Sequence, residues 1–90
     1  MAFEGMDVAA VQGISKQLAN QATAIQTVIS TVDSIVGNAG SVWHGPDVTK
    51  FVSDWHSHKS ALTNAQTAIH NLSLKAMQNA NAQNTTSNSY

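Results

Sequence analysis

The chain has 90 residues, of which 42% are hydrophobic and only 10% charged, with a formal net charge of −1 and no cysteine. This length fits a single domain, and the lack of cysteine excludes a disulfide framework, a thiolate metal site and a thiol nucleophile. Because lysine and arginine together number four, the sequence also excludes the basic stripe that nucleic-acid binding requires and a polybasic membrane-surface helix.

The chain also lacks two segments that place a protein in or across a membrane. The amino-terminal sequence MAFEGMDVAA has no cationic region followed by an apolar one, so we expect no cleavable secretion signal. No run of 18 apolar residues occurs either, so we expect no transmembrane span and no stable membrane insertion.

The first predicted element is a long amphipathic helix over residues 8–36, with Asp7 as its N-cap. Apolar residues recur in it every seven positions, the period of helices that pack side by side. One series that we expect to line the helix contact is Val11, Leu18, Ile25 and Val32. A second expected series is Ile14, Gln21, Val28 and Ile35, and a third, which widens the apolar stripe to one side, is Ala22, Ile29 and Val36.

A connector is predicted over residues 37–45. Gly37 and Gly40 end the first helix, whereas Pro46 suits the first turn of a second helix because it lacks an N–H group and has a fixed φ. Trp43 stands in this connector, followed by His44 and Gly45. We expect the indole of Trp43 to bury most of its apolar surface.

The second predicted helix covers residues 46–77 and repeats the heptad design of the first. Its two series are Val48, Trp55, Leu62, Ile69 and Ala76, and Phe51, His58, Ala65 and Leu72. Two helices of equal period joined by a short connector pack as antiparallel neighbours. The sequence therefore predicts an all-α fold, a helix-turn-helix hairpin domain over residues 1–83, followed by a disordered polar tail over residues 84–90.

The apolar stripes of the two helices are wider than one helix–helix contact covers. We therefore expect each hairpin to bury the remaining apolar surface against a partner, most simply as a four-helix bundle made from two hairpins. The residues that we expect in the core and the dimer contact are Val11, Leu18, Ile25, Ile29, Val32, Phe51, Trp55, Leu62 and Ile69.

No set of residues in the sequence points to catalysis. No acid, base and nucleophile converge in a recognisable motif, so we expect no enzymatic activity and no cofactor. His56 and His58 are two positions apart, about 200° around a helix, and cannot chelate one metal ion. We interpret His58 as a neutral histidine paired across the bundle.

The run Trp43-His44-Gly45-Pro46-Asp47-Val48, followed at helical spacing by Phe51 and Trp55, resembles the WXG family of small type VII (ESX-like) secretion substrates. The resemblance covers residues 7–83. It implies a hairpin that dimerises into an antiparallel four-helix bundle and is secreted in folded form by a membrane ATPase machine, alone or with a larger effector. It also implies that Trp43 and Gly45 form the turn signature and that Trp43 belongs to a bipartite export signal.

The other half of that signal, Tyr-x-x-x-Asp/Glu, has no match, since the only tyrosine is Tyr90. We therefore expect a non-enzymatic secretion substrate or secretion partner that is exported efficiently with a homologous WXG-type partner or a larger effector. Two alternatives remain open: a cytoplasmic chaperone or targeting subunit for a larger toxin-like effector, and a purely structural helical bundle.

Overall fold

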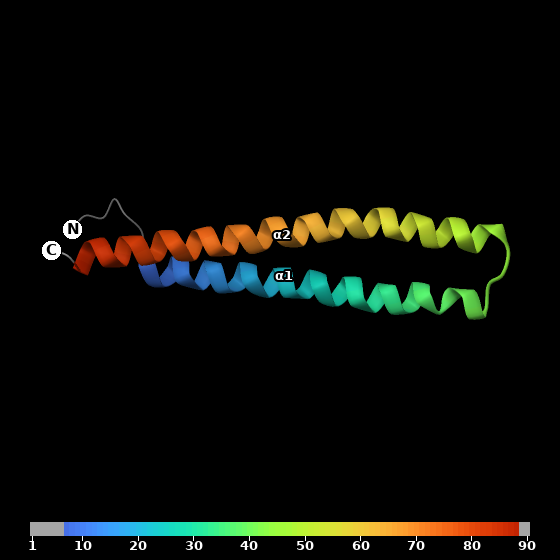
Figure 1. Ribbon diagram of the computed structural model, residues 1–90. Helices are drawn as coiled ribbons and strands as arrows, with labels where there is room; N and C mark the ends of the chain where they lie inside the picture. Colours follow the sequence, from blue (N-terminus) through green and yellow to red (C-terminus); the bar gives the residue numbers. More distant parts are fainter. Residues whose placement is uncertain (1–6, 89–90) are drawn as a thin grey trace.

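The computed structural model describes residues 7–88 and shows two long helices that lie side by side and run in opposite directions (Figure 1). Helix α1 spans Val8–Gly37 and helix α2 spans Pro46–Asn88, with a short 3-10 helix η1 at Ala39–Ser41 between them. The hairpin is a thin rod of 69 × 16 × 15 Å. The predicted all-α helical hairpin is confirmed.

Helix α1 begins where the sequence predicts. The side chain of Asp7 accepts a hydrogen bond from the backbone N–H of Ala10 at 3.1 Å, which satisfies one of the free donors of the first turn. The helix ends at Gly37, one residue beyond the predicted end. The N–H of Asn38 then bonds back to the carbonyl oxygens of Ser34 and Ile35.

The connector is held by local backbone bonds rather than by a packed core. The N–H of Trp43 donates to the carbonyl oxygen of Ala39 at 2.9 Å. Gly45 has a φ of +116°, a conformation that side chains with a Cβ rarely adopt, and Pro46 follows as the first residue of α2. The glycine of the Trp-x-Gly sequence therefore has a definite backbone role.

Helix α2 continues to Asn88, so the predicted end at residue 77 and the predicted disorder from residue 84 are wrong as far as the described residues reach. The reason lies in small side chains. Ser73 and Ala80 of α2 are buried, and Ala80 is fully covered. A search for recurring large apolar residues does not detect buried positions occupied by serine or alanine. The part of the predicted tail at residues 89–90 lies outside the described residues.

The contact between the helices is turned to one side of its predicted position. The buried series of α1 is Ser15, Ala22, Ile29 and Val36. The series of Ile14, Val28 and Ile35, which we expected in the helix contact, stays 49%, 51% and 61% exposed. That expectation is wrong because small residues at positions 15 and 22 let α2 approach closely on their side of the Val11 series.

Two contacts between the helices define their register. We call the end of the hairpin at the connector the closed end and the other end the open end. The hydroxyl of Ser15 donates to the carbonyl oxygen of Ser73 at 2.7 Å in a buried position near the open end. Near the closed end, the indole N–H of Trp55 donates to Asp33 at 2.7 Å. These two bonds determine which residues of α1 lie level with which residues of α2.

Candidate interaction surface

One long side of the hairpin carries an uncovered apolar stripe, which we call the apolar face. It consists of eight exposed residues: Ile14, Gln21, Val28 and Ile35 of α1, and Phe51, His58, Ala65 and Leu72 of α2. In heptad geometry each of these positions lies about 80° from the centre of the helix contact. Because the helices are antiparallel, both series turn to the same side of the hairpin.

The apolar face is organised in four rows. The register set by Ser15–Ser73 and Asp33–Trp55 places one residue of each helix in each row. From the open to the closed end the rows are Ile14 with Leu72, Gln21 with Ala65, Val28 with His58, and Ile35 with Phe51. At 1.5 Å per residue they extend over about 32 Å.

At the closed end the apolar face continues into the connector. The rings of Trp43 and Phe51 lie with their centroids 5.1 Å apart and their planes tilted by 46°, a favourable arrangement for an aromatic pair. Both remain accessible, with 38% of Trp43 and 41% of Phe51 exposed. The expected burial of the Trp43 indole is therefore only partly realised within one chain.

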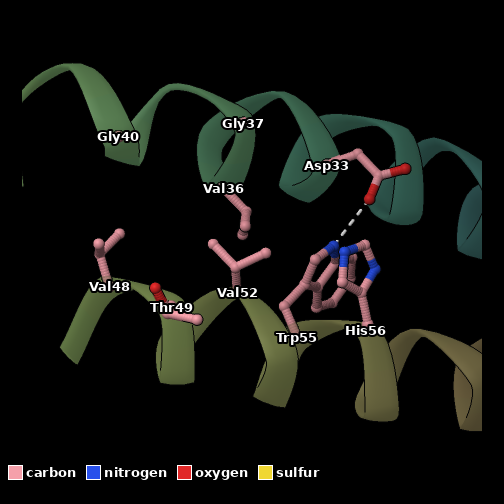
Figure 2. A pocket seen from close by; sticks show the side chains of 9 residues that line it. All are labelled: Asp33, Val36, Gly37, Gly40, Val48, Thr49, Val52, Trp55 and His56. Atoms are coloured by element: carbon pink, nitrogen blue, oxygen red, sulfur yellow. Dashed lines mark hydrogen bonds between the residues drawn. The ribbon is translucent and has the colours of Figure 1, made fainter. Parts of the chain in front are cut away.

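The opposite side of the hairpin, which we call the polar face, carries Gln26 and Asp33 of α1 and His56, Thr63 and His70 of α2. Its main feature is Asp33, which accepts hydrogen bonds from two residues of α2. Lys59 Nζ donates to Oδ2 at 2.8 Å, and Trp55 Nε1 donates to Oδ1 at 2.7 Å (Figure 2 shows the second bond). We refer to these three residues as the Asp33 clamp.

The electrostatics of the Asp33 clamp favour an ionised carboxylate. The hydrogen bond from Lys59, then the bond from Trp55, hold the pKa of Asp33 below its ordinary value, and partial burial opposes them only in part. A charged acceptor with two donors on the other helix stabilises one relative placement of α1 and α2.

Beside the Asp33 clamp lies an open pocket of about 470 Å³ at the closed end of the polar face. Gly37 and Gly40 leave room there because they have no side chains, and Val36, Val48 and Val52 give the pocket an apolar floor (Figure 2). Trp55, Asp33, Thr49 and His56 complete the lining. The pocket can accommodate an apolar group, and the Asp33 carboxylate at its edge is already bonded to Lys59 and Trp55.

Most residues predicted for the core and the dimer contact lie between the two helices of one hairpin. Ile29 is buried there, and seven more are half-buried: Val11, Leu18, Ile25, Val32, Trp55, Leu62 and Ile69. Phe51 is the exception, because it lies on the apolar face beside Trp43. Trp43 and Gly45 both lie in the connector.

The Asp33 clamp and the Ser15–Ser73 bond were not predicted from the sequence. A signal for the clamp was present, since Lys59 follows Trp55 by one helical turn and Asp33 is the only carboxylate within α1. A pattern of apolar residues alone does not show which residues of two helices lie level with each other, so the pairing of Asp33 with Trp55 and Lys59 could not be predicted. Ser15 and Ser73 carried no signal, because serine is common on exposed helix surfaces.

His56 and His58 lie on opposite faces, His56 in the pocket of the polar face and His58 on the apolar face. In the single hairpin the side chain of His58 is exposed, so its pairing across a bundle stays a prediction. Within residues 7–88, no three histidine or carboxylate side chains are grouped as a metal site requires. No described helix has the length and apolar character that crossing a membrane needs.

Comparison with protein-family models, curated proteins and solved structures finds no match for this chain. The interpretation of the site therefore depends on its sequence motif and its geometry.

Proposed function

We propose that this chain is a WXG-type, non-enzymatic type VII secretion substrate or secretion partner that acts through contacts between helical hairpins. The observation that carries the proposal is the apolar face, which runs along one side of the hairpin and ends at Trp43 of the Trp-x-Gly turn. An enzyme needs converging reactive groups, whereas this surface offers an extended area for a helical partner.

The small core of the hairpin supports a role for a partner. Among residues 7–83 the buried hydrophobic residues are Ala22, Ile29, Val36 and Ala80, and none of the larger ones is completely covered. Five larger side chains remain exposed on the apolar face, namely Ile14, Val28, Ile35, Phe51 and Leu72. Burying a fully exposed side chain of this size contributes about 1.5–3 kcal/mol. Since these five are already about half covered, covering the rest contributes roughly half of that for each, which favours association.

In this proposal two hairpins join through their apolar faces into a four-helix bundle, and the bundle is the form that the secretion ATPase exports. The second hairpin is another copy of the chain, a homologous WXG-type partner or the helical hairpin of a larger effector. The exposed edge of the Trp43 indole is the part of the turn that a receptor contacts.

Secretion from a host with an intact type VII system tests the proposal, with and without the product of the neighbouring gene. We expect efficient export with that product, loss of export for Trp43→Ala, and little effect of Val42→Ala, a matched change at an exposed connector residue. Helicity and association should be retained in both variants.

Two results would contradict the proposal in different ways. Cytosolic retention of this chain while the larger product is exported would indicate the chaperone alternative. Equal export of the parent and Trp43→Ala would show that the turn is not part of the signal.

A further inference from the structure

Two polar residues interrupt the apolar face, and they occupy neighbouring rows on different helices. Gln21 lies level with Ala65, and His58 lies level with Val28, in the two central rows. Both side chains are exposed in the single hairpin. Leucine would extend the apolar stripe at either position, so the presence of polar groups there calls for a physical reason.

Two copies of the hairpin can place their apolar faces together in two symmetric ways. In the first, the closed ends are at opposite ends of the bundle, α1 packs on α1 and α2 on α2. Gln21 of one copy then shares a layer with His58 of the second copy, and this happens twice. In the second arrangement, the closed ends of both copies lie at the same end of the bundle, and each residue shares a layer with the same residue of the other copy.

The first arrangement also matches side-chain volumes. Ala65 of one copy lies directly opposite His58 of the second copy, and Phe51 lies opposite Leu72, so a small residue faces each imidazole. In the second arrangement one layer holds both imidazoles and another holds two alanines, which leaves the layers unequally filled. Uniform filling of layers is the more stable packing.

We propose that Gln21 of one copy and His58 of a second copy form a hydrogen-bonded pair across the interface and that this pair selects the homodimer with closed ends at opposite ends. The carboxamide and the imidazole each offer a donor and an acceptor, so they satisfy each other when desolvated. A buried polar pair fixes orientation and register because misalignment leaves its members unpaired.

The dimensions of the hairpin permit this dimer. Its long side measures 69 by 16 Å, so a second hairpin of the same length can lie along all four rows of the apolar face. The inference rests on the proposed association of hairpins and adds which residues decide its geometry.

A mixing experiment tests the pair directly. Gln21→Leu leaves both imidazoles of its homodimer unpaired, and His58→Leu leaves both carboxamides unpaired. We expect each change to raise the dimer dissociation constant at least about tenfold. A mixed dimer of the two variants keeps one Gln21–His58 pair and converts the other to a leucine contact.

We therefore expect the mixed dimer to form in large excess over both variant homodimers, as measured by native mass spectrometry with one variant isotopically labelled. Mixing Gln26→Leu with His56→Leu is the matched control, because these residues are the same types on the polar face. The control should give a statistical mixture. A statistical mixture for Gln21→Leu with His58→Leu would overturn the pair.

Orientation is measured independently with a spin label at Ser41→Cys, since the chain has no other cysteine. Ser41 lies in the connector at the closed end. Closed ends at opposite ends of the bundle place the labels on the order of 50 Å apart, and coincident closed ends place them within about 20 Å.

We expect one long distance for the parent and both distances for the double variant Gln21→Leu/His58→Leu. A short distance in the parent, or a single long distance in the double variant, would overturn the inference. A monomer at every concentration would instead contradict the proposed hairpin association.

Discussion

The apolar face and the polar face lie on opposite sides of the same two helices, but they differ in how far their side chains are paired or covered within one chain. On the polar face, the charge of Asp33 is matched by Lys59 and by the indole N–H of Trp55. On the apolar face, Ile14, Val28 and Ile35 have about half or more of their surface exposed. The hairpin therefore has one face whose central charge is paired within the chain and one face whose apolar side chains are left exposed.

This difference shows that one heptad pattern contains both residues buried between α1 and α2 and residues exposed on the apolar face. A shift of one position along the helix changes a residue from buried inside the hairpin to exposed on the apolar face, as the neighbours Val28 and Ile29 illustrate. Ile29 is 4% exposed and Val28 is 51% exposed. Matched mutations at Val28 and Ile29 are therefore expected to separate effects on folding from effects on association.

The largest effect is expected for Ile29→Asp. An unpaired carboxylate between α1 and α2 costs about 3–5 kcal/mol, so the variant should be less helical than the parent at every protein concentration. Circular dichroism across a dilution series checks this. Parent-like helicity at low concentration would contradict the placement of Ile29 inside the hairpin.

Val28→Asp is the matched change on the apolar face. It should abolish association, and its helicity should equal that of the parent once the parent is diluted below its dissociation constant. The same dilution series, combined with sedimentation velocity, measures both properties. If this variant still dimerises, the apolar face is not the interface.

The next effect concerns the polar face. The pKa of Asp33 is lowered in the folded chain, so its contribution to stability is full above the ordinary aspartate range and is lost as the pH falls through the lower folded value. Thermal unfolding between pH 7 and pH 3 should show the parent losing stability below about pH 4.

Asp33→Asn should reduce stability at neutral pH and remove that part of the acid dependence. Asp54→Asn is the control, because Asp54 pairs only with Lys50 on an exposed surface of α2. Equal acid profiles for the parent and Asp33→Asn would show that the Asp33 clamp contributes nothing measurable.

A smaller effect is expected in the connector. Gly45→Ala places a Cβ on a residue with a φ of +116°, which costs about 1–2 kcal/mol. Gly40→Ala adds a Cβ that meets nothing within 4 Å and should be nearly neutral. Melting temperatures of the two variants check the difference, and equal values would contradict a special role for the backbone of Gly45.

The smallest effect has the opposite sign. Gly13 lies inside α1, and an added Cβ there meets nothing within 4 Å. Gly13→Ala should therefore stabilise the chain by about 0.5–1 kcal/mol, because alanine restricts the unfolded chain more than glycine. Urea unfolding at fixed protein concentration measures the change, and a loss of stability would indicate an unrecognised contact at this position.

The sequence was sufficient for the elements and their pairing, because Asp7, Pro46 and the sevenfold recurrence of apolar residues all act locally. It was insufficient for the rotation of the helices about their axes. The Ile14 series and the Ile29 series lie on either side of the Val11 series, and the heptad pattern does not show which of the two faces α2. The small side chain of Ser15 and the bonds made by Ser73 and Asp33 favour the Ile29 series. The end of α2 was missed because Ala80 is too small to continue a pattern of large apolar side chains.

We propose that a second copy of the hairpin covers the apolar face, and the molar mass of the purified chain in solution shows whether it does. Light scattering on the purified chain at micromolar concentration should give twice the mass of 9.5 kDa, and Val28→Asp should return it to the single mass. A fully helical parent that stays at 9.5 kDa at high concentration would contradict the claim, since its apolar face would then be stable in water.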